Sequence, residues 1–73
     1  MKLAEYLRAH KIRQTQFALL LGGKPSTLHG WITGRRMPEL AVAIQIQEIT
    51  NGLVRPEDFV RAAEDRRNAK EAA

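Results

Sequence analysis

The chain has 73 residues, no cysteine, two histidines and a formal net charge of +4. Its length allows one domain, and its residue content excludes both a disulfide and a Cys/His zinc site. The apolar runs are far shorter than the roughly 18 residues of a membrane span, so we expect a cytoplasmic protein that does not enter membranes.

Apolar residues recur at helical spacing along the chain without strand-like alternation, which predicts an all-α fold of five helices. We expect the first three helices over about residues 2–10, 14–21 and 25–33. The pair Gly22-Gly23 supplies the permissive backbone that ends the second helix, and Gly34 ends the third.

Each of these helices has an apolar stripe that is expected to face the core. The stripes comprise Leu3, Tyr6, Leu7 and His10 in the first helix, Phe17, Leu20 and Leu21 in the second, and Leu28, Trp31 and Ile32 in the third. The stripe of the third helix leaves five residues on the outer side, namely Ser26, Thr27, His29, Gly30 and Thr33.

The fourth helix is expected to open at Met37-Pro38-Glu39 and to extend to about Thr50. It is apolar on two sides, with Val42, Ile46 and Ile49 on one stripe and Leu40 and Ile44 on the other. A helix with two apolar sides usually has two neighbours. The second neighbour is either another helix of this chain or a second subunit.

A proline followed by two acidic residues at positions 56–58 predicts the start of a fifth helix, which Phe59 and Val60 anchor to the core. The remainder is rich in alanine and charge but has no large apolar residue, so we expect a solvated helical extension that frays towards Ala73. We therefore assign residues 1–62 to one compact domain and residues 63–73 to a charged extension.

Charge is distributed unevenly along the chain. Residues 1–36 contain seven basic residues and one acidic residue, a net charge of +6, whereas residues 37–73 contain five basic and seven acidic residues, a net charge of −2. Clustered positive charge is typical of a protein with a polyanionic partner. A solvated basic surface without a partner is the alternative, but the cluster coincides with the two-helix unit over residues 14–36, which favours DNA.

Two short helices joined by a tight glycine-containing turn form the unit that lays a helix in the DNA major groove. The spaced residues Gln14, Ala18, Gly22, Leu28, Trp31 and Gly34, closed by WITGRR, resemble the helix-turn-helix of lambda-type phage repressors and Cro proteins. The chain looks most like small Cro-like and YdaS-like bacterial or prophage regulators. The resemblance covers about residues 1–60 and implies a lambda-repressor-like domain that represses transcription from an operator in double-stranded DNA.

The resemblance also implies roles for individual residues. The outer residues of the third helix are expected to contact bases: Ser26, Thr27, His29, Gly30 and Thr33. Among them, His29 is expected to donate to guanine N7 or O6, or to reach a phosphate. Phosphate contacts are expected from Arg13, Gln14, Thr15, Gln16, Lys24, Arg35 and Arg36, although one of the last two arginines is long enough to reach a base edge.

Two glycines depart from the family pattern. Family members usually carry a polar side chain at the position of Gly30 and an apolar one at the position of Gly23. Glycine inside a helix costs about 1 kcal/mol relative to alanine. At Gly30, either a close approach of DNA or tight helix packing is expected to offset this cost.

One recognition helix covers few base pairs, so we expect a homodimer on a palindromic operator, whose assembly can depend on the DNA. The interface is predicted at Leu40, Ile44 and Phe59. No catalytic constellation is present, and we expect no enzymatic activity, cofactor, metal or small-molecule substrate. The rival class is a helix-turn-helix module that binds a protein, such as an antitoxin-like autoregulator. Salt dependence of binding distinguishes it from a DNA-binding protein.

Overall fold

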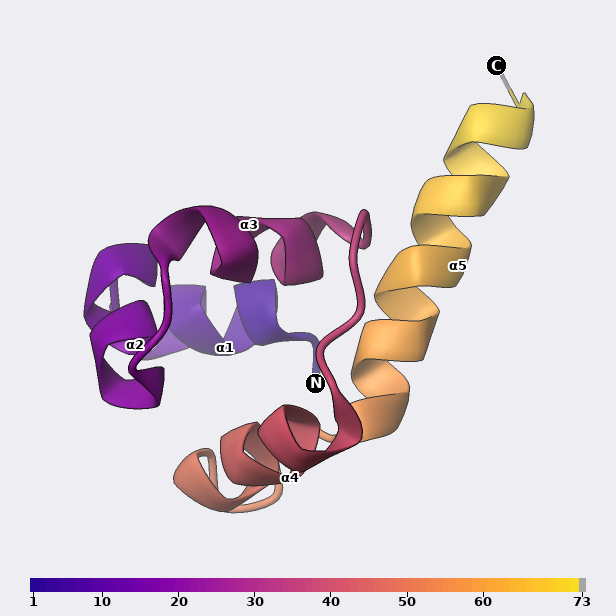
Figure 1. Cartoon of the computed structure of the whole chain (residues 1–73). Coiled ribbons are helices and arrows are strands. Elements are labelled where there is room, and N and C mark those ends of the chain that lie inside the picture. The colour runs from indigo at the N-terminus through magenta and orange to yellow at the C-terminus, as the bar shows by residue number, and fades with distance from the viewer. Residues whose placement is uncertain (73) are drawn as a thin grey trace.

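In a computed structural model, residues 1–72 are described and form five helices without a strand. The helices are α1 (Leu3–Ala9), α2 (Gln14–Leu21), α3 (Pro25–Thr33), α4 (Leu40–Ile49) and α5 (Pro56–Ala72) (Figure 1). The all-α, five-helix prediction is confirmed, while the fraying expected at Ala73 lies outside the described residues. No helix in the described part of the chain combines the length and the apolar character that a membrane crossing demands.

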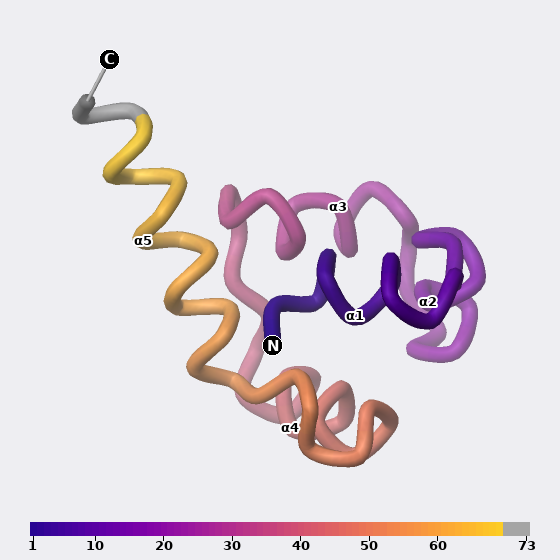
Figure 2. The backbone as a smooth tube through the Cα atoms, turned by 180° about the vertical axis from the view of Figure 1, so that it is seen from behind, coloured from indigo at the N-terminus to yellow at the C-terminus, as the bar shows by residue number. Residues whose placement is uncertain are grey.

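The helices lie in two tiers (Figure 1). α1, α2 and α3 lie together, with α2 packed against α3, and α4 lies on the other side of the core. α5 packs against both α4 and α3, so it ties the two tiers together. The carboxyl-terminal half of α5 then rises beyond α3, as the views from both sides show (Figures 1 and 2).

Every helix contributes to a single apolar core. Its buried side chains are Leu3, Leu7, Phe17, Ala18, Leu28, Ala43, Ile46, Val54 and Phe59. Tyr6, Trp31 and Val42 are among the half-buried side chains packed against them. The core therefore holds α2 and α3 against α1, α4 and α5, which fixes the orientation of the two-helix unit.

Three side chains predicted to face the core are exposed instead: Leu20, His10, which follows the last residue of α1, and Val60, which is 43% exposed beside the buried Phe59. Leu20 was expected in the core but is 62% exposed, because the buried face of α2 is centred on Phe17 and Ala18, which places Leu20 on its flank. Phe59 anchors α5 to the core as predicted and is 3% exposed, because the first turn of α5 packs into the core shared with α4. It also lines an apolar groove beside Leu40, so its place at a dimer interface stays a prediction in which it can contribute little exposed surface.

The predicted start of α4 is also wrong by three residues. The helix begins at Leu40, and Glu39 is the residue before its first turn, with an extended backbone (φ −62°, ψ 153°). Pro38 restricts the residue before it to extended conformations, so Met37 and Pro38 belong to the connecting loop. The loop from Arg35 to Glu39 therefore connects the two tiers, with bends at Arg35 and Arg36 and an extended backbone at Glu39.

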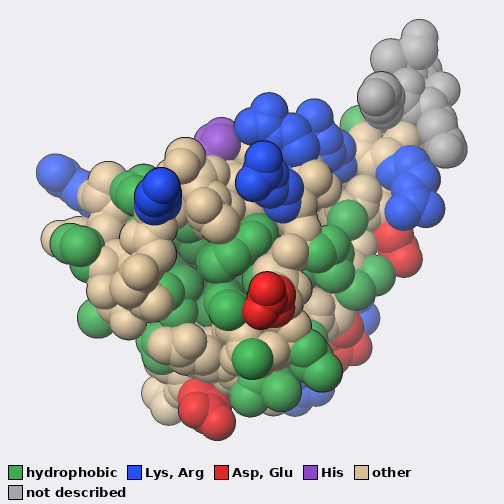
Figure 3. Space-filling view, viewed as in Figure 1, with side chains coloured by type: hydrophobic (Ala, Val, Ile, Leu, Met, Phe, Trp, Pro, Cys, Tyr) green, Lys and Arg blue, Asp and Glu red, His purple; other side chains and the backbone are tan. Residues whose placement is uncertain are grey.

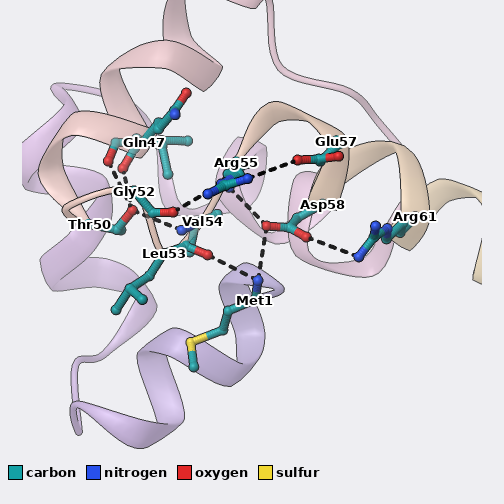
Figure 4. Close-up of polar contacts among 11 residues, drawn as sticks. Met1, Gln47, Thr50, Gly52, Leu53, Val54, Arg55, Glu57, Asp58 and Arg61 are labelled. Carbon is teal, nitrogen blue, oxygen red and sulfur yellow. Dashed lines mark hydrogen bonds and ion pairs between the residues drawn. The ribbon is translucent and has the colours of Figure 1, made fainter.

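Thr50 joins the end of α4 to the segment that leads into α5 (Figure 4). Its buried hydroxyl donates to the carbonyl of Ile46 at 2.8 Å and accepts the backbone N–H of Val54 at 3.1 Å. A buried polar group is tolerated when its hydrogen bonds are made, and here both roles of the hydroxyl are used. The turn between the two helices is thus held from inside.

Asp58 organises the start of α5 (Figure 4). Its side chain is 5% exposed, and one carboxylate oxygen accepts both the backbone N–H of Arg55 at 2.9 Å and the amino group of Met1 at 3.1 Å. The other oxygen lies 3.9 Å from the Arg61 guanidinium. Further along α5, Lys2 pairs with Asp65, and this hydrogen bond raises the pKa of Lys2 above its ordinary value.

Candidate nucleic-acid interface

The turn between α2 and α3 is set by a glycine in the left-handed region. Gly22 ends α2 with φ of +72°, and the backbone N–H of Gly23 donates to the carbonyl of Ala18 at 3.0 Å. Lys24 then takes an extended conformation, and Pro25 occupies the first position of α3. These local preferences confirm the predicted boundaries of both helices and fix the angle between them.

α3 is held to the core on one side and open on the other. Leu28 is fully buried, and Trp31 and Ile32 are half-buried against the core, as predicted. Ser26 and His29 are exposed on the opposite side. The outer residues of α3 are thus presented by a helix whose inner face is anchored, which is the requirement for a rigid reading surface.

The loop after α3 folds back onto the helix. The backbone N–H of Arg36 donates to the carbonyl of Gly30 at 3.1 Å, and the stem of its side chain lies over Gly30. A Cβ atom added at Gly30 would meet the Cβ, Cγ and Cδ atoms of Arg36 at 3.5 Å. These are ordinary van der Waals distances, so the Arg36 stem packs over Gly30 but would also tolerate a methyl group there.

Gly30 is consequently not open on the outer face as expected, because it is buried beneath Arg36. The arginine covers the position at which the sequence lacks a polar side chain. Thr33 is half-buried, and its hydroxyl donates to the carbonyl of Gly30 at 3.3 Å. At this end of α3 the side chain that reaches outward is that of Arg36.

The structure brings several predicted contact residues around one shallow depression of about 160 Å³. It is lined by Ser26, Thr27, Gly30, Arg35 and Arg36. Ser26 and Thr27, which are expected to read bases, therefore lie beside Arg35 and Arg36, two arginines from the loop that follows α3. In the space-filling view, lysine and arginine side chains gather along the same upper edge, over α3 and the loop that follows it (Figure 3).

A second link joins α2 to α3. The Nδ1 atom of His29 lies 3.3 Å from Oε1 of Gln14, and both side chains are exposed. Because an amide oxygen only accepts, Nδ1 is the donor when this hydrogen bond forms. Gln14, predicted to contact phosphate, therefore also orients the predicted base reader.

The remaining predicted phosphate contacts lie around the first turn of α2 and the following turn. Arg13, Thr15, Gln16 and Lys24 are exposed. The side-chain oxygen of Gln16 accepts the backbone N–H of Arg13 at 3.1 Å, so this glutamine closes the start of the helix and keeps only its amide N–H groups for another partner. The structure places all four at the surface without showing a contact with DNA.

A family model described as helix-turn-helix matches residues 3–56, which is most of the chain and includes α1 to α4. No curated protein and no solved structure gives a significant match. The matched region contains the Gly22 turn, the anchored α3 and the Arg35–Arg36 loop, which are the features that build the candidate interface.

Proposed function

The chain belongs to the helix-turn-helix family and is a DNA-binding transcriptional regulator, and we propose that it is a Cro-like repressor of phage or prophage type that reads a palindromic operator with α3. The observation that carries this proposal is the depression at which exposed Ser26 and half-buried Thr27 of α3 meet Arg35 and Arg36. Arginine gives charge-assisted contacts to phosphates and to guanine, and small hydroxyl side chains fit close to base edges.

Within this proposal the residues divide into two groups. We assign Gln14, Lys24 and Arg35 to the phosphate backbone. At Gln14 and Lys24 the amino-terminal ends of α2 and α3 add positive partial charge, and Arg35 brings its own charge from the loop after α3. Ser26, Thr27 and His29 read the bases. With Nδ1 of His29 beside Oε1 of Gln14, we assign Nε2 to the base edge, where the tautomer decides between guanine N7 or O6 and the amino group of adenine or cytosine.

Replacing His29 with alanine is expected to reduce discrimination between the operator and random duplex DNA by about 5- to 10-fold, with a smaller loss in non-specific affinity. The operator is first selected from random DNA, and both affinities are measured by fluorescence anisotropy at one salt concentration. His10→Ala is the matched control, because His10 is exposed at the end of α1 and stacks on Tyr6. Equal losses for operator and random DNA would show that His29 does not read bases.

We also propose that the regulator binds its operator as a two-fold dimer, with half-sites about one helical turn (~34 Å) apart. An apolar groove of about 260 Å³ supports this proposal. Leu40 lines the groove and is 68% exposed, and Ile44 on the next turn of α4 is 43% exposed. Met37 and Val60 also line the groove and are 50% and 43% exposed. Because Phe59 is in the core, these side chains and Leu40 form the apolar surface that is available to a second copy of the chain.

Leu40→Glu is expected to leave the monomer folded and to change the complex on a two-half-site duplex from two proteins per duplex to one. A charge placed in a desolvated apolar interface without a partner is strongly unfavourable, whereas the exposed side chain contributes little to the monomer core. Sedimentation equilibrium measures the stoichiometry. Leu53→Glu, at a side chain 45% exposed outside the groove, is the control. A parent protein that binds one copy per duplex would refute the dimer.

The same groove supports a second candidate function, in which an antitoxin-like autoregulator binds a protein partner there. An apolar protein contact responds weakly to salt, whereas binding through phosphates weakens steeply as salt rises. A steep salt dependence of DNA binding that remains after Leu40→Glu would separate the DNA-binding surface from the groove.

A further inference from the structure

We propose that the carboxyl-terminal half of α5 is a second DNA-contacting element, in which Arg66 and Arg67 bind phosphates of the duplex beside the base pairs that α3 reads. This inference rests on the proposed mode of DNA binding by α3. It assigns a binding role to a segment that the sequence indicated only as a solvated extension, and that lies beyond the matched residues 3–56.

The contact that directs α5 past α3 is made at Gly34. This residue ends α3 with φ of +79°, and a Cβ atom added to it would lie 2.7 Å from the carbonyl carbon of Ala62 and 3.0 Å from the Cα atom of Ala63. The backbone of α5 therefore rests directly on the loop that begins with Gly34 and continues into Arg35. No side chain separates the helix from this loop.

Helix periodicity continues that contact face towards Arg66. Residues three and four positions apart share a face of a helix, so Arg66 lies one turn, about 5 Å, beyond Ala62 and Ala63 on the same stripe. Arg67 lies at the edge of this stripe. Both arginines are exposed. α5 therefore places the side chains of Arg66 and Arg67 one turn beyond its contact with the Gly34 loop, in the direction in which the helix extends past α3.

The neighbouring acidic residues on α5 point elsewhere. Asp65 lies at the other edge of the stripe, where it pairs with Lys2 beside α1. Glu64 falls on the opposite side of the helix from Ala62, at about 100° per residue. The stripe that faces the Arg35–Arg36 loop is thus basic, even though the second half of the sequence carries a net negative charge.

Basic side chains lie both at the loop after α3 and on α5. In the space-filling view, arginine and lysine side chains line the upper edge over α3 and its loop, and a separate basic group lies on α5 with an acidic side chain beside it (Figure 3). In the ribbon views, α5 extends past the level of α3 (Figures 1 and 2). The part of α5 after Ala63 is long enough to reach from the loop to the DNA backbone. Two helical turns span about 11 Å, and the major groove that α3 enters is about 8.5 Å deep. When α3 enters the groove, the end of α5 therefore stands beside the sugar-phosphate strand at its border.

Arg66→Gln/Arg67→Gln tests this inference through the salt dependence of binding. Each phosphate that is neutralised contributes about 0.9 to the slope of log K against log salt concentration. We expect the double variant to reduce the steepness of the slope by up to about 1.8, with parallel losses for the selected operator and for random duplex. Glutamine keeps the helix propensity, and circular dichroism checks the fold.

The matched control is Arg55→Gln/Arg61→Gln, which removes the same net charge near the other end of α5. Both control side chains are exposed, and they lie beside Glu57 and Asp58. We expect the control to change the slope much less. Equal changes in both double variants would overturn the inference, because overall charge would explain them, and an unchanged slope in Arg66→Gln/Arg67→Gln would overturn it directly.

A positive control separates this inference from the proposed function. Arg35→Gln/Arg36→Gln is expected to flatten the slope whether or not α5 contacts DNA. A parent protein that binds no duplex would overturn both proposals. If the parent binds duplex DNA, the Arg35/Arg36 variant flattens the slope and the Arg66/Arg67 variant leaves the slope unchanged, only the role of α5 is overturned.

Discussion

Gly34→Ala is expected to lower the free energy of unfolding by about 2–5 kcal/mol. An L-residue in the left-handed region costs about 1–2 kcal/mol, and forcing an extra methyl into a packed site costs about 1–3 kcal/mol more. The methyl group would lie against the Ala62 carbonyl and Ala63 of α5, and this backbone cannot rotate away as a side chain can. A domain of this size has a total stability of only about 4–11 kcal/mol, so urea unfolding will show the loss clearly.

The control for this change is Gly22→Ala. Gly22 has nearly the same backbone conformation, with φ of +72° against +79°, but nothing lies within 4 Å of an added Cβ atom. Its replacement is expected to cost only the conformational part, about 1–2 kcal/mol. The difference between the two variants measures the contact of the Gly34 loop with α5. Equal losses would show that this contact does not hold the two elements together.

Gly34 also connects stability to DNA binding. The alanine variant can relieve its clash only by moving α5 or the loop that carries Arg35 and Arg36, and either movement displaces basic side chains from the edge shared with α3. We therefore expect Gly34→Ala to weaken DNA binding below its unfolding temperature, while Gly22→Ala, whose turn lies away from α5, leaves the Arg35–Arg36 loop in place.

Local sequence signals were sufficient for most of the fold. Gly22, Pro25 and Gly34 each set a helix boundary through the backbone conformation that the residue itself allows, so the structure confirms the limits of α2 and α3. Leu20 and Val60 were misplaced because the burial of a side chain depends on how its helix is rotated against its neighbours. Helical periodicity restricts that rotation to one broad face and does not distinguish the centre of the face from its flank.

In the candidate interface too, features set by neighbouring residues were predicted, whereas contacts between residues far apart in the sequence were not. Its residue types were predicted from the motif, but the contact between Gln14 and His29 joins positions 15 apart, and the cover of Gly30 by Arg36 depends on the path of the loop. The position of Arg66 depends on the direction of α5, which Gly34 sets through a backbone contact that no pattern in the sequence indicates. These features follow from tertiary packing, so they became visible only in the folded chain.

Asp58→Ala is the second change with a large expected effect, a loss of about 2–4 kcal/mol in the free energy of unfolding. The substitution leaves the N–H of Arg55 without its acceptor and takes from the Met1 amino group one of its two acceptors, the other being the carbonyl of Leu53. Removing one partner from a buried, charged hydrogen-bond network costs more than the bonds themselves contribute. Asp65→Ala removes the same charge from the same helix, but Asp65 is 59% exposed, so we expect little change in stability.

Asp58→Asn separates geometry from charge at this site. Asparagine keeps an oxygen that can accept the N–H of Arg55 but loses the attraction to the Met1 amino group and the Arg61 guanidinium, so its stability is expected to lie between those of the parent and the alanine variant. If asparagine were as damaging as alanine, charge would dominate; if Asp65→Ala were as damaging as Asp58→Ala, burial would not be the cause. Because Asp58 holds the first turn of α5, Asp58→Ala is also expected to loosen the base from which the helix reaches Gly34 and the DNA, and to weaken DNA binding more than Asp65→Ala.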